Sequence, residues 1–68
     1  MDEQATTTAD TLELLLLNQV AIRAALEELS LWVSRRGPVN VHENVTTALA
    51  TVDIHAEAIS SGIARLRA

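Results

Sequence analysis

A break near the middle of the 68-residue chain constrains its fold more than any other feature. In the segment SRRGP, Gly37 suits a left-handed residue after a last helical turn, and Pro38 blocks continuation. Arg35 and Arg36 complement the negative end of a helix dipole. The segments on both sides have helical spacing of apolar residues, and neither alternates with period two over a useful length. The sequence therefore predicts two helices and no strands.

Capping patterns place the starts of these helices. Asp10 followed by Glu13 resembles a capping box, and Asn40 followed by Glu43 repeats it after the break. Residues 1–7 have no periodic pattern, which predicts a flexible acidic N-terminal arm. The remaining residues 8–68 are predicted to form a helical hairpin, with a helix over about 8–36, a turn over 37–40 and a helix over about 41–67.

The short connection predicts an antiparallel pair of helices, because about four residues cannot span the length of a helix. This arrangement places Arg65 and Arg67 near Asp10 and Glu13. It also sets Asn18 about one turn from His55, within reach of a polar contact.

Apolar residues are distributed differently along the two halves. In the second half they form one stripe with steps of three and four: Val41, Val45, Ala48, Val52, His55, Ile59, Gly62 and Leu66. Leu49, Ala56 and Ile63 widen this stripe. In the first half the main stripe is Leu12, Leu15, Ile22, Leu26, Leu29 and Val33, with Leu16, Leu17, Val20, Ala24 and Leu31 on the far side. One neighbouring helix cannot cover both sides of the first helix.

The uncovered apolar surface predicts association. The chain is 49% apolar and has no cysteine, so neither a disulfide nor a Cys-ligated metal stabilises it. We therefore predict an all-α fold in which two hairpins assemble into a homodimeric four-helix bundle. The residues predicted to form the dimer and core seam are Leu15, Ile22, Leu26, Leu29, Val33, Val45, Val52, His55, Ile59 and Leu66.

Each polar or small residue within or beside these stripes has a functional interpretation and a packing interpretation. His55 is a metal ligand, a pH switch or a packed half-buried histidine, and packing is favoured because no second histidine lies four residues away. Asn18 and Gln19 are a recognition site or, as we favour, residues that specify register and oligomeric state. Ala48, His55 and Gly62 favour close helix packing over a shallow groove for a partner.

A candidate partner surface lies near the turn and consists of Val20, Leu31, Trp32, Arg35 and Arg36. Trp32 is either an interface anchor or a core residue, since tryptophan is common in both places. The arginines flank this surface or only complement the helix end.

Catalytic chemistry is not indicated. The segment HENVT lacks the second histidine of a metalloprotease motif, and two glycines are too few for a phosphate-binding loop. The predicted helix pairing puts no serine or threonine beside a His–Asp pair. We predict no enzymatic activity, no cofactor and no metal.

The net charge of −4, without lysine, disfavours a phosphate-binding surface. No signal peptide and no run of 18 apolar residues are present, which predicts a cytoplasmic protein without membrane contact. The expected partner is a second copy of the chain, and another protein is a further candidate.

The segments LLLLNQ, SRRG and HAEAISSGIARL, within residues 14–66, resemble small bacterial two-helix proteins, some of unknown function. The layout also resembles Rop-like proteins, which dimerise into four-helix bundles and bind RNA hairpins. These resemblances imply a fold. The predicted function is a non-enzymatic protein–protein interaction or regulatory module, with a Rop-like RNA-binding regulator as the alternative. For the alternative, the candidate contacts are Arg23, Arg35, Arg36, Arg65 and Arg67.

Overall fold

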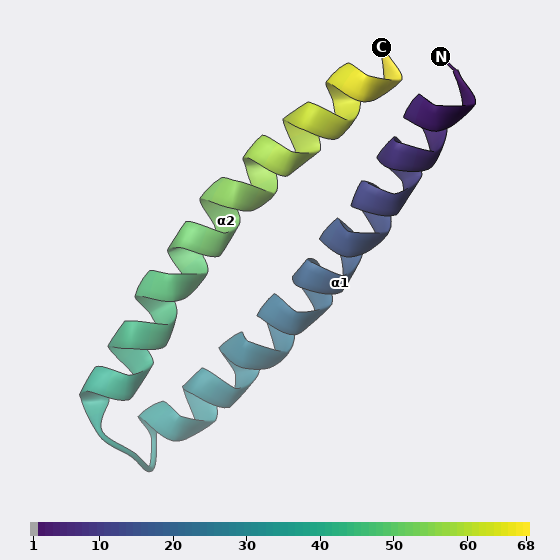
Figure 1. The fold of residues 1–68 in the computed structure, drawn as a ribbon. Coiled ribbons are helices and arrows are strands. Elements are labelled where there is room, and N and C mark those ends of the chain that lie inside the picture. The colour runs from purple at the N-terminus through teal and green to yellow at the C-terminus, as the bar shows by residue number, and fades with distance from the viewer. Residues whose placement is uncertain (1) are drawn as a thin grey trace.

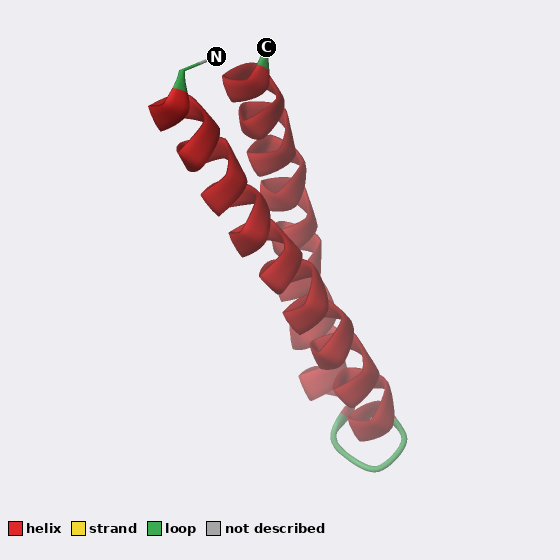
Figure 2. Cartoon of the chain, turned by 90° about the vertical axis from the view of Figure 1, so that its right-hand side faces the viewer, coloured by secondary structure: helices red, strands yellow, loops and turns green. Residues whose placement is uncertain are grey.

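The computed structural model describes residues 2–68, which form two long helices joined by a short turn (Figure 1). Helix α1 spans Glu3–Ser34 and helix α2 spans Val39–Arg67. The helices lie side by side and antiparallel, so that both chain ends lie at the open end of the hairpin (Figures 1 and 2). No strand occurs within residues 2–68. The prediction of an all-helical hairpin is therefore confirmed.

Helix α1 begins earlier than predicted, and the arm predicted over residues 1–7 is wrong for residues 3–7, which are helical. Met1 lies outside the described residues. Asp2 has an extended backbone, and its side chain accepts a hydrogen bond of 2.6 Å from the Ala5 backbone N–H. This contact is an N-cap, and it satisfies one of the free N–H groups of the first turn. Asp10 therefore lies inside the helix and caps nothing.

The turn lies at residues 35–38 instead of the predicted 37–40. Pro38 occupies the N-cap position of α2 with φ of −63°, so Asn40 is already helical and is not the cap. Gly37 is not left-handed, which corrects the prediction from its position. Glycine relieves crowding there, because an added Cβ would lie 3.1 Å from the Val33 carbonyl oxygen and 3.0 Å from Val33 Cγ1, closer than an ordinary van der Waals contact.

The interface between the helices is one row of residues on each, spaced by three and four as in a coiled coil. We call these rows the inner seam. On α1 the inner seam is Ala9, Leu12, Leu16, Gln19, Arg23, Leu26, Ser30 and Val33, of which Leu26 lies at the edge and is 44% exposed. On α2 it is His42, Val45, Leu49, Val52, Ala56, Ile59, Ile63 and Leu66. Ala9, Leu49 and Ile63 are its most buried apolar members, at 0%, 6% and 7% exposed.

The predicted apolar stripe of α1 differs from its inner seam. Leu16, which was assigned to the far side of the helix, is half-buried against α2. Leu15, Ile22 and Leu29 are instead 59%, 60% and 61% exposed. The stripe was predicted from apolar residues alone, whereas three polar residues occupy the inner seam of α1: Gln19, Arg23 and Ser30.

One chain alone does not form a compact globule. Its accessible surface is 5191 Å², and a compact monomer of this mass exposes about 4,200 Å². The Cα radius of gyration is 15.7 Å, against about 11 Å for a compact domain of this length. The surface exceeds that of a compact monomer by about 1,000 Å², and several leucines and Ile22 of α1 are among the exposed residues.

We expect Gly37→Ala to destabilise the hairpin by about 1 kcal/mol, because the new Cβ crowds the Val33 carbonyl and forces the backbone or Val33 to shift. Urea unfolding at one fixed chain concentration measures this loss. The control is Gly62→Ala, whose Cβ meets nothing within 4 Å in the chain and which should be neutral or stabilising. Equal destabilisation by both substitutions would contradict the assigned role of Gly37.

Candidate interaction surface

A second row with coiled-coil spacing lies on α1 beside the inner seam, and we call it the outer seam. It consists of Leu15, Asn18, Ile22, Ala25, Leu29 and Trp32. Each of these residues directly precedes an inner-seam residue, so the two seams lie about 100° apart around the helix. The four large apolar members are exposed, and Trp32 is 57% exposed.

The outer seam borders two hollows. A groove of about 400 Å³ runs between the helices and is lined by Leu15, Asn18, Gln19, Ile22, Arg23, Leu26, Leu49 and Val52. A hollow of about 460 Å³ lies toward the turn and is lined by Ala25, Glu28, Leu29 and Trp32. The latter four residues have the spacing i, i+3, i+4 and i+7, which in coiled coils forms the hole that accepts a side chain from a neighbouring helix. The shape of this surface therefore suits another helix.

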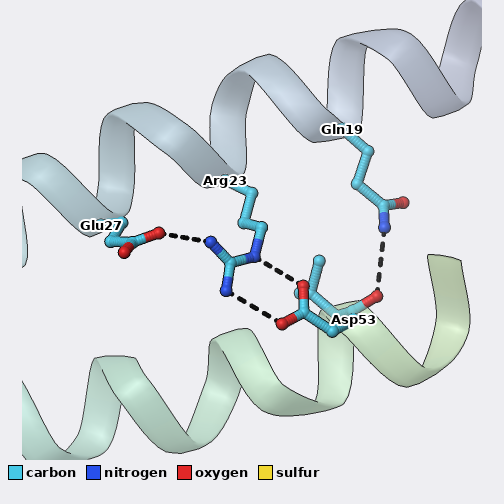
Figure 3. Close-up of polar contacts among 5 residues, drawn as sticks. Gln19, Arg23, Glu27 and Asp53 are labelled. Carbon is cyan, nitrogen blue, oxygen red and sulfur yellow. Dashed lines mark hydrogen bonds and ion pairs between the residues drawn. The ribbon is translucent and has the colours of Figure 1, made fainter.

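An ion-pair cluster joins the two helices near their middle (Figure 3). The Arg23 guanidinium donates two hydrogen bonds to the Asp53 carboxylate, from Nε at 2.5 Å and from Nη2 at 2.9 Å. It also donates to Glu27, one turn along α1. Beside this cluster, the Gln19 amide donates to the Val52 carbonyl oxygen at 3.4 Å (Figure 3).

These contacts shift the ionisation of both partners. Hydrogen bonds from Arg23 hold the pKa of the Asp53 carboxyl below its ordinary value of 3.8. The hydrogen bonds to Asp53 and then to Glu27 raise the pKa of Arg23. The Asp53 side chain is 51% exposed, so the pair contributes little to stability.

The expected ion pairs at the open end are confirmed for Arg67. Its Nη2 donates to Asp10 at 3.0 Å and to Glu13 at 3.3 Å. Arg65 takes part in no ion pair within residues 2–68. Asp10 and Glu13, which were interpreted as helix-capping residues, therefore bind the C-terminal end of α2 instead.

The sequence interpretation did not find a contact between Ser30 and His42. Ser30 Oγ and His42 Nδ1 lie 2.7 Å apart in a hydrogen bond, and Ser30 is 5% exposed. Both residues occupy the inner seam, at the end next to the turn. Extending the three–four spacing through polar positions would have identified them.

The structure divides the predicted dimer and core seam into two sets. Six members lie in the inner seam: Leu26, Val33, Val45, Val52, Ile59 and Leu66. Leu15, Ile22 and Leu29 lie in the outer seam, and His55 is exposed on α2. The expected contact between Asn18 and His55 is absent, because neither side chain forms a hydrogen bond within residues 2–68 and both are exposed.

The predicted partner surface is also divided. Val20 and Leu31 are 54% and 47% exposed and lie about 20° apart around α1. Trp32 lies about 120° from Val20 and belongs to the outer seam. The Arg36 guanidinium lies over the Trp32 ring, 4.6 Å from its centroid, in a cation–π contact. Arg35 is exposed and, like Arg36, has no carboxylate partner within residues 2–68.

Comparisons with protein-family models, with curated proteins and with solved structures gave no match to this chain. Across residues 2–68, neither helix has an apolar stretch long enough to cross a membrane. The same residues contain no group of three or more His, Asp or Glu side chains placed to hold a metal ion.

We expect Asp53→Asn to lower the melting temperature slightly at pH 7, because it removes the charge that pairs with Arg23. Folding lowers the pKa of Asp53 below its ordinary value of 3.8. The stabilisation by the ionised Asp53 carboxylate is therefore complete above pH 3.8, and it is lost as the pH falls through the pKa of Asp53 in the folded chain. The difference from the wild type should therefore shrink below pH 3.8. Thermal unfolding followed by circular dichroism across this range measures it.

Glu57→Gln provides the control, since Glu57 is an exposed carboxylate of α2 without an ion pair within residues 2–68. A difference between wild type and Asp53→Asn that stays the same from pH 7 to pH 2 would contradict the role given to the ion pair.

Proposed function

We propose that this chain is a small, non-enzymatic protein–protein interaction or regulatory module that acts as a homodimer, with two hairpins forming a four-helix bundle. The outer seam carries this proposal. A helix in a four-helix bundle has two neighbours roughly at right angles, and α1 has two seams about 100° apart. Helix α2 occupies only one of them.

The amount of exposed surface supports association. The excess of about 1,000 Å² over a compact monomer is close to the roughly 800 Å² that each partner buries in a typical stable interface. Because the exposed residues of the outer seam are mostly apolar, covering them supplies the hydrophobic stabilisation that one hairpin lacks.

The polar groups support a role without catalysis. Ser30, the serine bonded to His42, is too buried to reach a substrate. The arginines also give little support to the RNA-binding alternative. Two of the five, Arg23 and Arg67, already bind carboxylates of the same chain.

A surface for a further protein partner would remain after dimerisation. Val20 and Leu31 lie away from the outer seam, together with Leu17, which is 59% exposed. Covering the outer seam therefore leaves this row of α1 free to contact another protein.

Ile22→Glu tests the proposal, because it places a charge in the middle of the outer seam. We expect the dimer dissociation constant to rise at least about 100-fold, since two symmetry-related copies of the charge lose their hydration. Sedimentation equilibrium over a range of micromolar concentrations measures the change.

The matched control is Ile54→Glu, which makes the same substitution at a residue of α2 that is 66% exposed and lies outside both seams. It should leave the dissociation constant unchanged. A wild-type chain that sediments as a folded monomer throughout this range would refute the proposed homodimer.

A further inference from the structure

We propose that the two copies pair α1 against α1, antiparallel and outer seam to outer seam, with the turns at opposite ends of the bundle. This inference rests on the proposed homodimer and specifies how its two chains meet. The twofold axis crosses α1 between Ile22 and Ala25, the middle of the outer seam.

Symmetry leaves two ways to place the outer-seam sides of two hairpins face to face. If the twofold axis is perpendicular to the helices, α1 lies opposite α1 of the second copy, α2 lies opposite α2, and the turns lie at opposite ends. If the axis is parallel to the helices, α1 lies opposite α2 of the second copy and the turns lie together. Neighbouring helices are antiparallel in both cases.

Apolar matching favours the first arrangement. There the outer seam meets itself, so that Leu15 lies level with Trp32 of the second copy, Ile22 with Ala25, and Leu29 with the one polar member, Asn18. In the second arrangement the opposing residues follow from the alignment within the hairpin, where Ser30 meets His42 and Arg23 meets Asp53. The large residues Leu15, Ile22 and Leu29 would then lie opposite Ala58, Thr51 and Asn44, and two of these are polar. The outer seam would then face a partly polar row of α2, whereas in the first arrangement it faces itself.

The hollow at Ala25, Glu28, Leu29 and Trp32 also fits the first arrangement. The antiparallel alignment brings Leu15 of the second copy to the Trp32 end of this hollow. Asn18 of the second copy lies level with Glu28 and Leu29 of the first copy, which line the hollow. The Asn18 amide can therefore donate a hydrogen bond to the Glu28 carboxylate, which has no ion-pair partner within residues 2–68. Both residues occur twice by symmetry, so both would be satisfied.

Charge favours the same arrangement. The turn end carries Arg35 and Arg36 against one carboxylate, Glu43, and the open end carries four carboxylates, those of Asp2, Glu3, Asp10 and Glu13, against the two arginines Arg65 and Arg67. Turns at opposite ends bring Arg36 level with Thr11 of the second copy, beside its acidic residues. Turns at the same end would instead bring two acidic ends together, which is unfavourable.

Disulfide cross-linking tests the arrangement, since the chain has no cysteine of its own. Asn18→Cys/Leu29→Cys places a cysteine in each half of the outer seam. These positions are about 16 Å apart on one helix, so they cannot join within a chain. We expect oxidation to give a covalent dimer of twice the chain mass, held by bonds from residue 18 of each copy to residue 29 of the other.

The matched variant is Asn18→Cys/His55→Cys, whose positions meet between chains only when α1 lies opposite α2 of the second copy. We expect no covalent dimer from it. Leu15→Cys/Trp32→Cys repeats the first test at the ends of the outer seam. This variant keeps Asn18 and Leu29, which the first variant replaces.

Sedimentation of the reduced variants separates the two proposals. A dimer that cross-links through residues 18 and 55, or through none of the three pairs, overturns the arrangement while the homodimer stands. A monomeric wild-type chain overturns the homodimer itself. Covalent dimers from the 18/29 and 15/32 variants, without one from the 18/55 variant, establish the arrangement.

Discussion

The rest of the structure depends on the inner seam, where each helix offers the other a single row of side chains. Toward the open end this row is apolar, with Leu12 and Leu16 of α1 and Ile63 of α2. Toward the turn it becomes polar, with Arg23 and Ser30 each bonded to a residue of α2. Hydrophobic burial therefore holds the hairpin along its whole length, with Leu49 buried in the turn half, and polar contacts across the seam are added in that half.

The consequence of this division is that the most apolar row of α1 lies outside the hairpin. Polar residues with partners on α2 occupy the inner seam, and the large apolar residues one position earlier form the outer seam. Adjacent leucines such as Leu15 and Leu16 thus serve different neighbours, because a helix turns about 100° per residue. The surface left exposed is what makes a second copy of the chain the proposed partner.

Much of the fold was predictable from local signals, and most of the site was not. The break at Gly37 and Pro38 and the short connection correctly indicated two antiparallel helices. The Asp2 cap was missed because Asp10 and Glu13 offered a stronger pattern, which serves Arg67 instead. Ser30 and His42 were missed because a search for apolar spacing gives polar residues no weight.

By itself, the sequence determined the helices, their break and the surplus of apolar residues on the first of them, because these follow from local propensity and from counting. Only the tertiary structure decided which row of α1 meets α2. That choice depends on contacts between residues far apart in the chain, such as Arg23 with Asp53, and periodicity along one helix carries no information about them. The rotation of α1 about its own axis, and with it the location of the exposed apolar row, follows from how the whole inner seam packs against α2, which no pattern within one helix specifies.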